Sequence, residues 1–77
     1  MVKVTVYSTP TCPWCKKAKE WLTAHKIKYN DIDVSSDEAA AEKMINATGQ
    51  TGVPQIEIDG EWIVGFDQDE LSKKLLK

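Results

Sequence analysis

The order of short strand-like and helix-like segments constrains the fold of this 77-residue chain more than any other feature. Apolar and polar residues alternate over residues 2–7, which is the period of a strand, and turn residues interrupt the pattern over 8–11. From Pro13 to about Lys26 the apolar positions follow helical spacing, and Pro13 is tolerated in the first turn. We therefore expect a strand, a turn and a helix that begins beside the two cysteines.

The middle of the chain continues the alternation. We expect a second strand over 28–34, followed by a helix within SSDEAAAEKMINATG. Ser35 and Glu38 have the spacing of a capping box, and Gly49 can stop this helix. Met44 and Ile45 are expected in the core, and Trp21 and Trp62 are expected to be half-buried packing residues.

The last third predicts a hairpin and a final helix. Asp59-Gly60 suits a tight turn between the alternating stretches of QIEIDGEWIV. Asp67 and Glu70 form a second pair of the capping-box type, before the apolar helix positions Leu71, Leu75 and Leu76. The resulting order is β-α-β-α-β-β-α.

This order predicts an α/β fold with a mixed four-stranded sheet flanked by three helices. Two strands joined through a helix should be parallel, whereas the last two form an antiparallel hairpin. The length fits a single domain over residues 1–77 with one modest core.

Both cysteines of the chain, Cys12 and Cys15, lie where the first strand gives way to the first helix. A structural disulfide is not expected, because closing a loop of about four residues removes little entropy from the unfolded chain. A structural zinc site is not expected either, because only His25 adds a further soft ligand. We therefore expect no metal, and a pair that opens and closes a disulfide.

The position of each thiol suggests its role. Cys12 lies where unpaired helix N–H groups and the helix dipole favour the thiolate, so it is the expected nucleophile. Cys15 lies one turn inside the helix and is the expected resolving thiol. Pro13 stiffens the turn between them, and Trp14 is either an exposed aromatic or a flat wall beside a bound disulfide.

Composition excludes several classes of function. With 42% hydrophobic and 29% charged residues the chain should fold, and its net charge of −2 gives no electrostatic case for nucleic acid or an anionic membrane. The N-terminal stretch MVKVTVYS has no long apolar run, so we expect neither a signal peptide nor a membrane span. We expect a cytoplasmic monomer, in a compartment that keeps thiols reduced.

Three motifs, YSTPTCPWC, TGQTGVPQIEIDG and IVGFDQDEL, together resemble the glutaredoxin family in their order and spacing. The chain is most similar to the small bacterial glutaredoxin-like proteins, and VGFDQDEL also resembles the redoxins that reduce ribonucleotide reductase. The resemblance implies a thioredoxin-like fold. It also implies a glutathione-dependent thiol-disulfide oxidoreductase that reduces protein disulfides and glutathione mixed disulfides, with glutathione as co-substrate and no permanently bound cofactor.

The resemblance also implies a glutathione site. In this family the proline of Val53-Pro54 is cis and faces the reactive cysteine, leaving the backbone of Val53 open to glutathione or an extended peptide. The N-terminus of the last helix would receive the γ-glutamyl carboxylate, and Asp67 its amine. The implied glutathione-binding residues are Trp14, Thr51, Val53, Pro54, Gly65, Phe66 and Asp67.

Departures from the family pattern leave alternatives open. Many glutathione-using members carry a lysine shortly before the first cysteine and a basic residue before Val-Pro, where this chain has Ser8 or Thr9 and Thr51. Their Gly-Gly pair is replaced by Val64-Gly65. The electrostatic grip on glutathione should therefore be weaker, and a thioredoxin-like carrier reduced by a flavoprotein reductase is the main alternative.

Two further hypotheses are a carrier of iron-sulfur clusters and a module that docks on one partner enzyme. Pro13 and Cys15 argue against the cluster carrier, because the resolving thiol competes for the nucleophile. Docking would use exposed Trp14 and Phe66 as contacts.

Overall fold

The computed structural model describes residues 3–75, so the expectations for Val2 and Leu76 lie outside the described residues. Residues 3–75 contain seven elements, in the order β-α-β-α-β-β-α that the sequence predicts. They are β1 (Val4–Ser8), α1 (Pro13–Ala24), β2 (Asn30–Asp33), α2 (Glu38–Thr48), β3 (Gln55–Ile58), β4 (Glu61–Val64) and α3 (Gln68–Leu75). No helix within this part of the chain is long and apolar enough to cross a bilayer.

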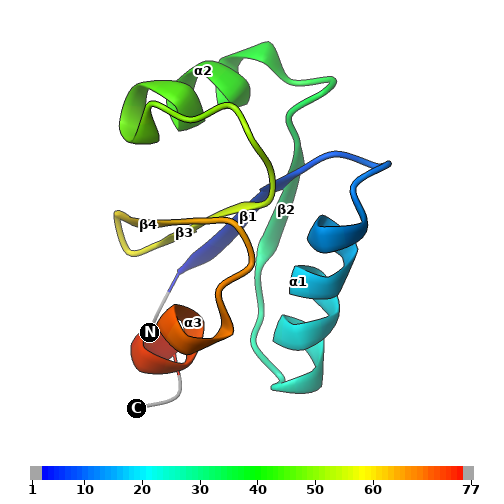
Figure 1. The fold of residues 1–77 in the computed structure, drawn as a ribbon, viewed down its shortest axis with the longest axis vertical. Helices are drawn as coiled ribbons and strands as arrows, with labels where there is room; N and C mark the ends of the chain where they lie inside the picture. The colour runs from blue at the N-terminus through cyan, green and yellow to red at the C-terminus, as the bar shows by residue number, and fades with distance from the viewer. Residues whose placement is uncertain (1–2, 76–77) are drawn as a thin grey trace.

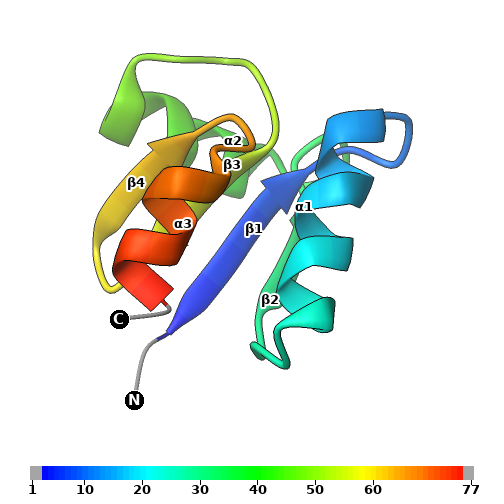
Figure 2. The same cartoon turned by 60° about the horizontal axis from the view of Figure 1, so that its bottom comes forward.

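The four strands form one mixed sheet in the order β2-β1-β3-β4. β1 runs parallel to β2, whereas the pairs β1–β3 and β3–β4 are antiparallel, as the connections predict. Helices α1 and α3 cover one face of the sheet and α2 covers the other (Figures 1 and 2). The thioredoxin-like α/β fold is thus confirmed.

β1 occupies an inner position of the sheet, and all five of its residues are buried. Val4 and Val6 belong to the main core together with residues of α1, β3, β4 and α3, namely Ala18, Leu22, Ile56, Ile58, Ile63 and Leu71. The side chain of Tyr7 alternates to the other face, where its ring centroid lies 4.8 Å from that of Trp62. Its hydroxyl donates to Glu57 at 3.3 Å, and burial followed by the Glu57 charge raises the pKa of Tyr7. Because helices cover both faces of the sheet, the polar residues of β1, Thr5 and Ser8, are buried as well.

Two predicted turns are confirmed. Asp59 and Gly60 both have positive φ, of 50° and 87°, which is the backbone that a tight two-residue hairpin requires. Gly49 ends α2 in the left-handed conformation, with φ of 70°, where a residue without Cβ is not strained.

The predicted start of α2 is wrong. Its N-cap is Asp37, whose carboxylate accepts the Ala40 N–H at 3.0 Å. Ser35 instead donates its N–H and its hydroxyl to Asp33 Oδ1, at 2.9 and 2.5 Å. Both hydrogen bonds lower the pKa of Asp33, and the bond from the Ser35 hydroxyl has the larger effect. The capping-box spacing gave a wrong prediction because Ser35 is hydrogen-bonded to the carboxylate of Asp33 and does not cap the helix.

Other differences concern exposure and length. Met44 is buried as expected, but Ile45 is 38% exposed, because neighbouring positions on a helix lie about 100° apart and cannot both face the sheet. Trp21 and Trp62 are half-buried as expected. β2 is shorter than the predicted 28–34, and α1 ends at Ala24 before Lys26, which adopts a left-handed φ of 58°.

The corrected cap can be tested by stability. Asp37→Ala should lower the free energy of unfolding by about 1 kcal/mol, because the Ala40 N–H loses its acceptor. Ser35→Ala should cost less than about 0.5 kcal/mol, because Ser35 is exposed and does not cap the helix. Urea unfolding of the reduced proteins measures both changes. A larger loss for Ser35→Ala than for Asp37→Ala would restore the capping box.

Candidate active site

Cys12 is the N-cap of α1. The chain leaves β1, turns over 9–11, and places Cys12 in an extended conformation with φ of −90° and ψ of 113°. Pro13 follows at the first helical position, where its missing N–H would have had no helical partner. The Cys15 N–H donates to Cys12 Sγ at 3.3 Å, so the sulfur takes the position of a capping oxygen. The half-buried Cys12 sulfur therefore lies at the positive end of the helix dipole of α1.

Cys15 lies one turn into α1 and is fully buried. Burial, with a smaller contribution from Cys12, raises the pKa of the Cys15 thiol to about 11. Both cysteines are free thiols in this structure. At neutral pH Cys15 is therefore protonated and shielded, whereas Cys12 is the accessible sulfur.

His25 is remote from the two thiols. It caps the opposite end of α1, where its ring centroid lies 4.1 Å from that of Trp21 and its Nδ1 lies 2.9 Å from the Trp21 carbonyl oxygen. Within residues 3–75 no group of three or more histidine, cysteine or acidic side chains is arranged to hold a metal ion.

The loop before β3 faces Cys12. The Val53-Pro54 peptide is cis, as the resemblance implied, and the Cys12 thiol donates to the Val53 carbonyl oxygen at 3.7 Å. The Gly65 N–H donates to the Pro54 carbonyl oxygen at 2.8 Å, which joins this loop to the segment before α3. Cys12, the cis-proline loop and the Gly65 segment are thereby brought to one end of the sheet.

Gln55 supports the cis-proline loop from inside, and the sequence analysis missed it. Its side chain is fully buried, and Nε2 donates to the carbonyl oxygens of Gln50 and Gly52, at 3.0 and 2.9 Å. These bonds satisfy the buried amide nitrogen and tie Gln55 to the loop, whereas the buried Oε1 has no hydrogen-bond partner among the described residues. The available signal was a polar residue directly after Val53-Pro54, at the start of the strand QIEI.

A groove of about 300 Å³ lies beside Cys12, lined by Trp14, Val53, Pro54, Gly65 and Phe66. Five of the seven residues expected to bind glutathione are therefore together. An adjoining hollow at the start of α3 is lined by residues 64–69, which include Asp67. Thr51 is exposed on the loop and lines neither space.

Trp14 lines the groove from the first turn of α1, and Asp67 lies in the adjoining hollow, directly before α3. Trp14 is 58% exposed, and the Lys17 ammonium lies 5.0 Å from its ring centroid, a cation-π contact that holds the ring against the helix. Asp67 caps α3 as predicted, accepting the Glu70 N–H at 3.2 Å. Its second carboxylate oxygen is not used by this bond.

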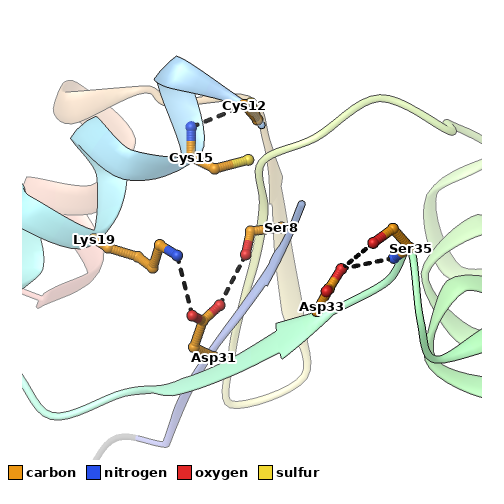
Figure 3. Close-up of polar contacts among 7 residues, drawn as sticks. All are labelled: Ser8, Cys12, Cys15, Lys19, Asp31, Asp33 and Ser35. Atoms are coloured by element: carbon orange, nitrogen blue, oxygen red, sulfur yellow. Dashed lines mark hydrogen bonds and ion pairs between the residues drawn. The ribbon is translucent and has the colours of Figure 1, made fainter. Parts of the chain in front are cut away.

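A polar cluster lies next to Cys15, and the sequence analysis missed it too. The Ser8 hydroxyl donates to Asp31 Oδ1 at 2.8 Å, and Lys19 Nζ donates to Asp31 Oδ2 at 3.0 Å (Figure 3). The hydrogen bond that Lys19 donates to Asp31 raises the pKa of Lys19. Helical spacing does place Lys19 on the side of Cys15, but nothing in the sequence identified Asp31 as its partner.

Known proteins that are similar in sequence to this chain include glutaredoxins and glutaredoxin-like proteins. A model of the glutaredoxin family, described as "Glutaredoxin", matches residues 4–63. The chain is 47% identical to an uncharacterised glutaredoxin-like 8.6 kDa protein in a rubredoxin operon of Clostridium pasteurianum, with 96% of this chain and 99% of that protein covered. It is 37% identical to glutaredoxin 3 of Escherichia coli, with 87% and 81% covered. It is 39% identical to the glutaredoxin-like protein NrdH of Lactococcus lactis, with 91% and 96% covered.

Solved structures agree with this grouping. The thioredoxin-like protein BC3987 superposes with a TM-score of 0.88 at 34% identity, covering 95% of this chain and all of that one. A buckwheat glutaredoxin in complex with glutathione superposes with a TM-score of 0.81 at 25% identity, covering 97% and 74%.

The burial of Cys15 predicts its reactivity with pH. The thiolate is the form that iodoacetamide alkylates, and burial raises the pKa of Cys15 to about 11. In a Cys12→Ser variant, alkylation of Cys15 at pH 8 should therefore be slow, and its rate should rise roughly tenfold per pH unit up to about pH 10. Mass spectrometry measures the rate, and the same variant unfolded in guanidinium serves as control. A rate that levels off below about pH 9 would contradict this assignment.

Proposed function

The chain belongs to the glutaredoxin family, and on that premise we propose that it is a dithiol glutaredoxin. It uses glutathione to reduce protein disulfides and glutathione mixed disulfides. The observation that carries the proposal is the position of Cys12: its sulfur caps α1, contacts the Val53 carbonyl oxygen, and lies beside an open groove. A nucleophile, a backbone edge and a helix terminus are thus available to one small substrate.

The reaction follows from the two thiols. The Cys12 thiolate attacks one sulfur of the substrate disulfide, forming a mixed disulfide and releasing one substrate thiolate, which takes up a proton. Cys15 then attacks the Cys12 sulfur, forming the Cys12–Cys15 disulfide and releasing the second substrate thiol. Two glutathione molecules return the protein to the dithiol form and leave as glutathione disulfide.

Glutathione is proposed to bind across the groove. Its cysteine backbone pairs with Val53, whose C=O now accepts the Cys12 thiol, in the manner of an added strand. Its γ-glutamyl carboxylate meets the N–H groups at the start of α3, and its amine meets Asp67. Trp14 and Phe66 cover its sides, and the Thr51 hydroxyl offers a hydrogen bond from the loop. The buckwheat relative with bound glutathione supports this class of ligand.

A thioredoxin-like carrier reduced by a flavoprotein reductase is the second candidate. Neutral Thr9 and Thr51 stand where many glutathione-using members have basic residues. The exposed Trp14 and the 48% exposed Val64 offer apolar surface near Cys12 for a protein partner. The similarity to the Lactococcus lactis NrdH protein favours keeping this candidate.

Single substitutions separate the roles of the thiols. Cys12→Ser should reduce all disulfide exchange to the background rate, because attack needs this sulfur. Cys15→Ser should lose reduction of protein disulfides yet keep part of the activity on glutathione mixed disulfides, because glutathione itself can release the product. Turnover assays with insulin and with a glutathionylated peptide measure the two activities. Equal losses in both variants would contradict the division of labour.

The electron donor can be identified directly. The oxidised protein should be reduced by millimolar glutathione in an assay coupled to glutathione reductase. Asp67→Ala should raise the glutathione concentration required by up to about fivefold, the value of an exposed ion pair. Its reduction by dithiothreitol should be unchanged, because dithiothreitol has no amine for Asp67.

Asp69→Ala is the matched control, since it removes an exposed carboxylate from the same end of α3. It should leave the glutathione requirement within about twofold of the wild type. If glutathione fails and thioredoxin reductase with NADPH reduces the protein efficiently, the carrier replaces the glutaredoxin proposal.

A further inference from the structure

The second chemical step needs a thiolate that the protein environment disfavours. Cys15 is fully buried, and its pKa is raised to about 11, first by that burial. At neutral pH the Cys15 thiol is therefore protonated almost entirely. A positive charge fixed near this sulfur would increase the population that attacks Cys12.

The polar cluster beside Cys15 contains such a charge. Ser8 is only 2% exposed and donates its hydroxyl to Asp31, whose other oxygen accepts Lys19 Nζ. Asp31 pairs with Val6 across the sheet, so its side chain emerges on the α1 face, where the apolar row of β1 ends in Ser8. Figure 3 shows Cys15 and Lys19 extending from α1 toward Ser8 and Asp31.

The ion pair with Asp31 of β2 fixes the Lys19 ammonium between α1 and the sheet. Lys19 follows Cys15 by four residues, so the two side chains share one face of α1. The Lys19 side chain is 27% exposed, as is that of Lys74, whereas the ion-paired lysines Lys43 and Lys73 are 61% and 73% exposed. The bond to Asp31 raises the pKa of Lys19, which therefore stays an ammonium and does not accept the Cys15 proton.

We propose that Lys19, anchored by Asp31 and Ser8, is a positioning residue for the resolving step: its ammonium stabilises the Cys15 thiolate that attacks the Cys12 mixed disulfide. The inference rests on the proposed two-step reaction and adds to it a residue that acts only in the second step. The charge acts through Cys15 and does not touch the substrate.

The step balances without a further reactant. Cys15 loses its proton to water, its sulfur bonds to the Cys12 sulfur, and the bond from Cys12 to the substrate sulfur breaks. The leaving thiolate takes up a proton, so one disulfide is exchanged for another. The ionisable and charged groups around Cys15 are Cys12 and Lys19 from α1 and Asp31 from β2, whereas β1 contributes the neutral Ser8. The Thr9 backbone adds a hydrogen bond that also favours the thiolate.

Stopped-flow reaction of the reduced protein with 5,5′-dithiobis(2-nitrobenzoate) separates the two steps. The first release of nitrothiobenzoate reports attack by Cys12, and the second reports attack by Cys15 on the mixed disulfide. Lys19→Gln should slow the second phase about three- to tenfold and leave the first within about twofold. The upper limit corresponds to a tenfold smaller fraction of Cys15 thiolate. The lower limit allows for the greater nucleophilicity of that thiolate once its pKa has risen.

Three comparisons make the result specific. Lys19→Arg should restore the second phase to within about twofold, because it keeps the charge. Lys16→Gln, which removes an exposed lysine beside Cys15, should change neither phase. Plotted against pH, the second-phase rates of Lys19→Gln should run parallel to those of the wild type but lower, whereas the first-phase rates should coincide.

The inference is overturned if the wild type is biphasic and Lys19→Gln has a second phase as fast as the wild type. It is also overturned if both phases slow together, or if Lys19→Arg is as slow as Lys19→Gln, since a structural role would then suffice. If Cys12→Ser still gives the first phase, the two-step reaction itself fails, and the role of Lys19 fails with it.

Discussion

The hydrogen bond from the Cys15 N–H to the Cys12 sulfur is the interaction on which the rest of the site depends. It makes the Cys12 sulfur the cap of α1, because the Cys15 N–H, which has no partner within the helix, donates to it. The same turn sends Cys15 inward, where burial raises its pKa to about 11. One helix start thus gives two identical side chains different chemistry, separated only by Pro13 and Trp14.

The groove exists because two distant loops meet at this helix. Hydrogen bonds hold both loops in place. The buried Gln55 amide donates to backbone carbonyl oxygens of the cis-proline loop, and the Gly65 N–H donates to the Pro54 carbonyl oxygen. Val53 is left facing Cys12 rather than paired within the sheet. A substrate disulfide that reaches the sulfur therefore meets a backbone edge that is already positioned, which lowers the entropy lost on binding.

Local patterns predicted the parts of the fold that local physics determines. The element order and the turns at Gly49 and Asp59 followed from periodicity and from backbone preferences. The start of α2 did not, because Ser35 had two competing partners and only the three-dimensional path of the chain selects one. The ion pair of Lys19 was missed for the same reason: its partner belongs to another element, and the register of β2 on β1 decides which residue that is.

The central claim is that a thiol bound to Cys12 lies across the cis-proline loop and the start of α3. The most direct test is NMR of the Cys15→Ser protein carrying glutathione in a mixed disulfide at Cys12. The account predicts contacts from the glutathione protons to Trp14, Val53 and Phe66, and a large shift of the Val53 amide resonance. Contacts confined to the immediate neighbours of Cys12, with glutathione otherwise free in solution, would contradict it.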